Sequence, residues 1–133
     1  MTASPPHGKG LALFGHPFSS YTQKVLIALW ANDTPFEFRM IDGQHPDNFA
    51  ELARHSPFKK FPLLIDDGTA VFETTHIIDH LDARHPGPHR WIPDGDMGRY
   101  VRFIDRFFDL YVMDQMSIPV FNAPRPEGQR DAF

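Results

Sequence analysis

Short apolar segments alternate with longer amphipathic segments over the first two thirds of the chain. Two apolar runs and one alternating run predict strands, because they are short and bounded by polar or turn-forming residues. The dipeptide Asp67-Gly68 is typical of a tight hairpin, so a return strand is expected directly after it. The predicted strands are residues 11–14, 36–41, 61–65 and 69–72.

Three segments between and after these strands have apolar residues at helical spacing. The predicted helices are residues 21–31, a short one within residues 42–55, and residues 74–84. Ser20 and Gln23 have the spacing of a capping box, which predicts Ser20 as the N-cap and leaves the Ser19 hydroxyl outside the helix. The resulting order, β-α-β-α-β-β-α, predicts an α/β, thioredoxin-like domain over residues 11–85 whose first two strands pair in parallel.

The last third of the chain differs from the first two thirds. Residues 86–96 are rich in proline, glycine and charge and are interpreted as a linker, with Trp91 and Ile92 docking on a neighbouring surface. Residues 97–116 predict one long helix that is apolar on two sides, and a helix of that kind must bury both. The proline-rich residues 117–133 predict a tail.

Composition and charge narrow the classes of function. The chain has 133 residues, a net charge of −4 and no cysteine. The negative charge gives no electrostatic case for binding nucleic acid or an anionic membrane, and no apolar run is long enough for a membrane span. The absence of cysteine excludes disulfides, thiol redox chemistry and cysteine-ligated zinc. Residues 1–10 lack the apolar core of a signal peptide, so we expect a disordered leader and a cytoplasmic protein.

Two features of residues 56–81 predict chemistry. Pro62 stands at the start of an apparently buried strand, where proline is tolerated only at an end or in a special turn. Glu73 and Thr74 place a carboxylate and a hydroxyl at a helix N-terminus, which attracts anions. His76 and His80 are four residues apart and have the spacing of metal ligands. His85, Asp79 and Asp82 lie nearby in sequence, but a solvated polar face explains these residues better, so no metal site is predicted.

Three segments together resemble bacterial cytosolic glutathione S-transferases. They are HPFSSYTQKVLIAL, KKFPLLIDDGTAVFETTHIIDHL, and DRFFDLYVM followed by RPEG. The resemblance implies a thioredoxin-like domain followed by one long helix of an otherwise missing all-α domain, as in a C-terminally truncated transferase. It also implies a homodimer formed through the helices at residues 74–84 and 97–116.

The resemblance further implies a binding site for glutathione. The Phe61–Pro62 peptide bond would be cis, and the Phe61 backbone would pair with the cysteinyl residue of the tripeptide. Glu73 would hold the γ-glutamyl ammonium, and Thr74 the γ-glutamyl carboxylate. The glycyl carboxylate would meet Lys60, with a second candidate at the same end, His45.

The same resemblance implies a serine-type transferase. Ser19 would donate a hydrogen bond to the sulfur of glutathione and favour the thiolate, which attacks a small hydrophobic electrophile. Ser20 and Tyr21 are rival hydroxyl groups, and Ser19 serving only as a turn or capping residue remains open. The residues expected to wall the electrophile pocket are Phe14, Phe18 and Tyr111. A catalytically silent binding or assembly module with the same fold is the alternative, because much of one pocket wall is missing.

Overall fold

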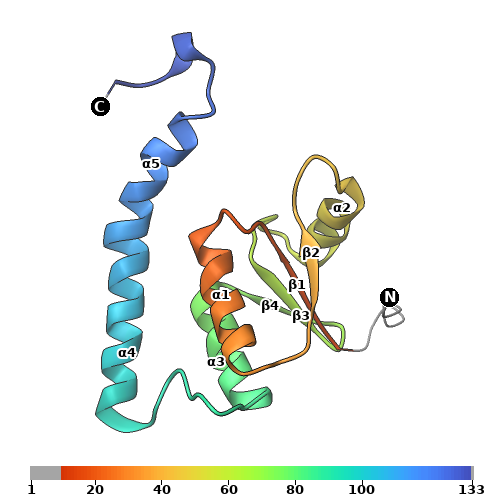
Figure 1. The fold of residues 1–133 in the computed structure, drawn as a ribbon, viewed down its shortest axis with the longest axis vertical. Coiled ribbons are helices and arrows are strands. Elements are labelled where there is room, and N and C mark those ends of the chain that lie inside the picture. Colours follow the sequence, from red (N-terminus) through yellow and green to blue (C-terminus); the bar gives the residue numbers. More distant parts are fainter. Residues whose placement is uncertain (1–9, 133) are drawn as a thin grey trace. The chain divides into compact units, whose positions relative to one another are not determined.

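A computed structural model describes residues 10–132 of the chain (Figure 1). The chain forms two compact units, which divide between Ile92 and Pro93. The predicted disordered leader falls, apart from Gly10, outside the described residues. No helix in residues 10–132 combines the length and the apolar character needed to cross a bilayer.

The first unit is built on a four-stranded sheet in the order β2-β1-β3-β4. Its strands are β1 (Leu11–Gly15), β2 (Glu37–Met40), β3 (Leu63–Asp66) and β4 (Thr69–Phe72). β1 pairs with β2 in parallel, which confirms that prediction, and β3 is antiparallel to both β1 and β4. The predicted strands therefore all form, and no end differs from its predicted position by more than two residues.

Helices cover both faces of this sheet. The helices of the first unit are α1 (Ser20–Ala31), α2 (Pro46–His55) and α3 (Thr74–Arg84). α1 and α3 lie side by side on one face and α2 lies on the other (Figure 1). Alternate strand residues serve the two faces, since Leu13 packs with α1 and α3, whereas the next residue, Phe14, packs with Leu52 of α2. This arrangement confirms the predicted α/β, thioredoxin-like fold.

Residues 86–92 belong to the first unit, so the prediction of a linker was wrong for this part. The Asp82 carboxylate of α3 accepts hydrogen bonds from the backbone N–H groups of Trp91 (3.0 Å) and Ile92 (2.7 Å). Asn32, after α1, exchanges two side-chain hydrogen bonds with the backbone of His89, both 2.9 Å long. Ile92 is buried and Trp91 packs on the core beside α1 and α3, which confirms the predicted docking of these two residues.

The second unit is one continuous helical segment with a short tail. It comprises α4 (Gly95–Phe107), the π-helical segment Phe108–Met113, α5 (Asp114–Asn122) and a 3₁₀ turn at Glu127–Gln129. The prediction that the helix ends at Met116 was wrong, because Pro119 lies inside α5. Proline removes one backbone donor, but the Ser117 hydroxyl still donates to the Met113 carbonyl (2.8 Å) and Ala123 N–H to the Pro119 carbonyl (3.0 Å).

The tail folds back on the end of this helix. The Asn122 side chain is buried, donates to the carbonyl of Asp131 (3.0 Å) and accepts from the Asp131 N–H (2.9 Å). Arg125 also reaches the Asp131 carboxylate at 2.7 Å. The residues after Pro119 are therefore held by specific contacts, which the sequence pattern did not indicate.

Candidate functional site

Strand register brings three separate segments to one end of the sheet. Phe14, next to the last residue of β1, pairs with Leu63 at the start of β3, and Leu63 pairs with Phe72 at the end of β4. Pro62 and Glu73 therefore lie at this same end, as does the loop that leads from β1 into α1. Both α1 and α3 begin at this end of the sheet.

Glu73 has an unusual backbone conformation at the start of α3. Its φ is 66° and its ψ is 129°, a combination that residues other than glycine rarely adopt. The side chain is exposed and makes no capping hydrogen bond to the helix that it precedes. Thr74, the first helical residue, is buried, and the first N–H groups of α3, which have no partner within the helix, follow Glu73 at this edge.

The segment before β3 completes this edge. The Phe61–Pro62 peptide bond is cis, as the resemblance implied. Pro62 is buried, whereas the Phe61 side chain is partly exposed and the preceding Lys60 is exposed. The antiparallel register of β3 and β4 places Pro62 next to Glu73 at the end of the sheet.

Ser19 caps α1, which corrects the prediction of Ser20 as the N-cap. The Ser19 Oγ accepts a hydrogen bond from the Thr22 N–H at 3.3 Å. Gln23 does not complete a capping box, because its side chain donates to the Pro17 carbonyl instead (2.8 Å). Ser20 is the first residue of the helix. The Ser19 hydroxyl is therefore engaged as an acceptor, but a hydroxyl that accepts still has its own proton to donate.

Close packing sets the path of the loop between β1 and α1. A Cβ atom on Gly15 would lie 2.5 Å from Thr22 Cγ2, so the strand can approach the helix this closely only at a glycine. The His16 N–H donates to Thr22 Oγ1 at 3.4 Å, and the Ser19 N–H donates to the His16 carbonyl at 2.9 Å. These contacts hold Ser19 at the head of α1.

The three predicted pocket residues differ in burial, and Tyr111 belongs to the second unit. Phe14 is fully buried beneath α2, where the guanidinium carbon of Arg39 lies 5.6 Å from its ring centre. It presents no surface to a ligand, so its predicted place in a pocket wall was wrong. Strand alternation causes this, because Phe14 points to the face of the sheet opposite α1. Phe18 is 77% exposed in the loop before α1, and Tyr111 is an exposed residue of the second unit.

His45 lies in the connection between β2 and α2. Its Nδ1 is 2.7 Å from Asp42 Oδ1, which also accepts from the backbone N–H groups of Gln44 (2.9 Å) and His45 (3.0 Å). The hydrogen bond from the His45 side chain is the largest of the effects that lower the pKa of Asp42 below its ordinary value. Since β1 and β2 run in parallel, this connection leaves the sheet at the same end as the Ser19 loop.

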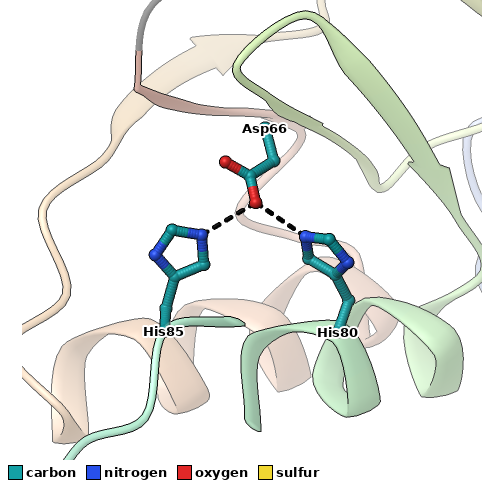
Figure 2. Close-up of side chains that lie close together, drawn as sticks. All are labelled: Asp66, His80 and His85. Atoms are coloured by element: carbon teal, nitrogen blue, oxygen red, sulfur yellow. Dashed lines mark hydrogen bonds and ion pairs between the residues drawn. The ribbon is translucent and has the colours of Figure 1, made fainter. Parts of the chain in front are cut away.

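A second cluster lies at the opposite end of the sheet. His80 Nε2 and His85 Nε2 both point at one oxygen of Asp66, Oδ2, at 2.7 and 2.8 Å (Figure 2). Burial would raise the pKa of Asp66, but the two imidazoles together outweigh it, so the pKa lies below its ordinary value. Sequence reasoning paired His80 with His76, which instead approaches the Phe72 carbonyl at 3.2 Å. No helical period links His80 to His85, so only the packing of α3 on β3 reveals this group.

The first unit resembles a known protein family in its sequence. Residues 13–89 match the family model of the glutathione S-transferase N-terminal domain. The chain belongs to the glutathione S-transferase family. The match begins within β1 and includes β2, β3, β4 and all three helices of the first unit, which confirms the family resemblance read from the sequence.

Individual members of the family are similar over more of the chain. Glutathione transferase GST 23 of Zea mays is 32% identical over 128 residues, which are 93% of this chain and 55% of the maize protein. Human glutathione S-transferase theta-1 is 35% identical over 88 residues, 63% of this chain and 35% of the human protein. The chain thus spans about half or less of the length of these relatives.

Solved structures extend the likeness to the fold. A glutathione S-transferase from Methylobacillus flagellatus, solved with glutathione bound, has a TM-score of 0.74 at 27% identity. The alignment covers 92% of this chain and 59% of that protein. An enzyme from Methylobacterium radiotolerans, solved with glutathione sulfonate, has a TM-score of 0.72 at 29% identity and covers 92% of this chain.

Proposed function

We propose that this chain binds glutathione at the sheet edge that carries Ser19, Pro62 and Glu73, and activates its thiol for attack on a small hydrophobic electrophile. The observation that carries the proposal is the register of β1, β3 and β4, which gathers these three segments beside two helix N-termini. The bacterial neighbour with bound glutathione, similar over 92% of this chain, supports the choice of ligand.

The γ-glutamyl end of glutathione carries both an ammonium and a carboxylate. The Glu73 side chain, exposed and without a capping bond, is suited to hold the ammonium. Thr74 and the first N–H groups of α3 are suited to the carboxylate, because a helix N-terminus attracts negative charge. The strained backbone of Glu73 fits this role, since such strain is kept where the surrounding structure uses it.

The rest of the tripeptide would follow the segment before β3. The Phe61 backbone would pair with the cysteinyl residue as an added strand does. Lys60 would meet the glycyl carboxylate by a charge-assisted contact. His45 is a second candidate for that carboxylate, and its hydrogen bond through Nδ1 to Asp42 leaves Nε2 for a ligand.

Ser19 would stabilise the thiolate. A free cysteine thiol has a pKa of about 8.5 and is mostly protonated at neutral pH. Lowering that pKa by one unit requires about 1.4 kcal/mol of preference for the charged form, which one hydrogen bond to a charged group can supply. Ser19 accepts from Thr22 N–H and would donate its own proton to the sulfur, at the positive end of α1. Ser20 and Tyr21 remain the rival hydroxyl groups.

Calorimetric titration of the whole chain with glutathione tests the binding step. We expect saturable heat, and its absence at millimolar ligand would overturn the proposal. Conjugation of a chlorinated nitrobenzene, followed by absorbance, tests the chemical step separately.

A catalytically silent binding module is the alternative, and the burial of Phe14 favours it. Of the two pocket residues predicted in the first unit, only Phe18 is exposed. Glutathione binding without conjugation would support this alternative, whereas conjugation above the rate without protein would rule it out.

We also propose that the chain forms a homodimer through α3 and the long helix of the second unit. Five exposed aromatic side chains follow one another along that helix, with neighbouring ring centres 5.3 to 6.5 Å apart. They are Tyr100, Phe103, Phe107, Phe108 and Tyr111. A contiguous apolar surface of this kind marks an interface.

A further inference from the structure

We propose that Asp66, His80 and His85 form a binding site for a divalent transition-metal ion of the Zn²⁺ type. Within the described part of the chain they are the one group of three histidine or acidic side chains whose ligand atoms converge, all within 4.8 Å of one another. Figure 2 shows both imidazole rings directed at the same carboxylate.

Regular elements hold these three side chains in place. Asp66 is the last residue of β3, which lies in the interior of the sheet between β1 and β4. His80 is on α3, whose residues Ile77 and Leu81 are buried in the core. His85 caps the C-terminus of α3 with φ −130° and ψ 55°, and this departure from helical geometry lets it reach the atom that His80 reaches. The site is therefore assembled before any ion arrives.

The ligand types and spacing suit zinc. Two imidazoles and one carboxylate, with a water in the fourth position, are a known zinc ligand set, with metal–ligand distances of about 2.0 to 2.2 Å. Ligand atoms at that distance from one ion lie roughly 3 to 3.5 Å apart, and the two Nε2 atoms already lie 2.7 and 2.8 Å from Asp66 Oδ2. A small outward movement of the side chains would admit the ion.

Partial exposure allows the ion to enter and to keep a water ligand. The side chains of His80, His85 and Asp66 are 18%, 31% and 13% exposed. The three side chains are therefore held in place by the residues around them, and an ion bound between them could still exchange with solvent. In a chain without cysteine, these are the ligand types left for a tight zinc site.

The site is separate from the proposed glutathione edge. Pro62 directly precedes β3 and Asp66 is its last residue, and the strand rise puts them roughly 13 Å apart. Glu73 precedes α3, whereas His85 follows it. The ion would tie the end of β3 to the C-terminus of α3, a structural link that does not require glutathione to bind.

Calorimetric titration of the metal-free whole chain with Zn²⁺ tests the proposal. We expect one tight site whose affinity falls more than about tenfold in His80→Gln, His85→Gln and Asp66→Asn. His76→Gln removes a histidine of the same helix and should leave the affinity within about twofold. Equal affinity in wild type and in all three site variants, or no binding to the wild type, would overturn the proposal.

A second measurement needs no variant and covers the case in which the variants fail to fold. Histidine ring nitrogen resonances of the wild type should shift at His80 and His85 Nε2 when Zn²⁺ is added, and those of His76 should not. Shifts confined to other histidines would refute the site. Titrations of the metal-free and the Zn²⁺-loaded chain with S-methylglutathione, which lacks the thiol that would itself bind zinc, separate this result from the proposed function, because the affinity should be the same in both.

Discussion

Ser19 caps α1 by accepting a hydrogen bond from the Thr22 N–H at 3.3 Å, and the same hydroxyl is the proposed donor to the glutathione sulfur. The oxygen of this hydroxyl would then stabilise the helix by accepting a hydrogen bond, and its proton would stabilise the thiolate by being donated to the sulfur. The two roles can be separated by substitution, because aspartate accepts a hydrogen bond and, when ionised, has none to donate.

Replacing Ser19 should separate these roles. Ser19→Ala should lose about 1 kcal/mol of unfolding free energy, because the cap disappears, and should raise the pKa of the bound glutathione thiol. Ser19→Asp should keep the cap and most of the stability but raise that pKa further, since it places a carboxylate beside the sulfur. Urea unfolding and the ultraviolet absorbance of the thiolate measure the two effects. An unchanged thiol pKa in both variants would remove Ser19 from the proposed chemistry.

Glu73 should lower the stability of the fold through its strained backbone and strengthen glutathione binding through its carboxylate. Glu73→Gly should raise the unfolding free energy by up to about 1 to 3 kcal/mol, because glycine adopts a φ of 66° without the steric cost. The same variant should bind glutathione at least about tenfold more weakly, since a charged partner for the ammonium is lost. Glu127→Gln, an exposed glutamate of the second unit, is the control for both measurements. A Glu73→Gly variant that is less stable, or that binds normally, would contradict the assignment.

Asp82 should stabilise the first unit by holding residues 86–92. Asp82→Ala leaves the N–H groups of Trp91 and Ile92 without their acceptor, so a loss of about 1 to 3 kcal/mol in unfolding free energy is expected. Trp91 fluorescence should change in the same variant, because the ring packs on the core. Asp47→Asn, at the exposed start of α2, should change stability by less than about 0.5 kcal/mol. Equal stability of Asp82→Ala and wild type would show that residues 86–92 are a linker after all.

Asp42 should make the β2–α2 connection sensitive to acid. Its pKa is lowered in the folded state from 3.8, chiefly by the hydrogen bond from His45, so the unfolded chain binds the proton more readily. The stabilisation is therefore present above the ordinary pKa and is lost as the pH falls through the lower, folded value. Asp42→Asn keeps the acceptor oxygen but not the charge. The difference in unfolding free energy between wild type and this variant should shrink toward zero in acid, and a difference that grows there would contradict the sign.

The aromatic side chains of the second unit should drive self-association. Sedimentation velocity should show a species larger than the monomer that dissociates on dilution. Phe103→Glu should shift the equilibrium toward the monomer, because it places a charge among neighbouring rings. Arg106→Gln, an exposed polar position on the same helix, should leave it unchanged. A wild-type chain that remains monomeric at high concentration would refute the interface.

Local patterns were sufficient for much of the first unit. The strands and helices were predicted because alternation, helical spacing and the Asp67-Gly68 turn are properties of neighbouring residues. The errors arose where distant residues decide. Phe14 belongs to a buried layer that only the packing of α2 reveals, and residues 86–92 are held by Asp82 and Asn32, which no local pattern connects to them.

The order of elements, the fold class and the family follow from the sequence by itself, since they depend on periodicity and on motifs within short segments. Tertiary structure alone decided which hydroxyl caps α1, where the first unit ends and which histidines meet. The cap depends on the path of the loop before α1, which the contacts of His16 with Thr22 and Ser19 hold in place. The other two depend on hydrogen bonds between residues of different segments, which form only when strands and helices pack. Asp66 shows this most directly, because its two partners lie within α3 and at its C-cap, five positions apart, a spacing that matches no helical period.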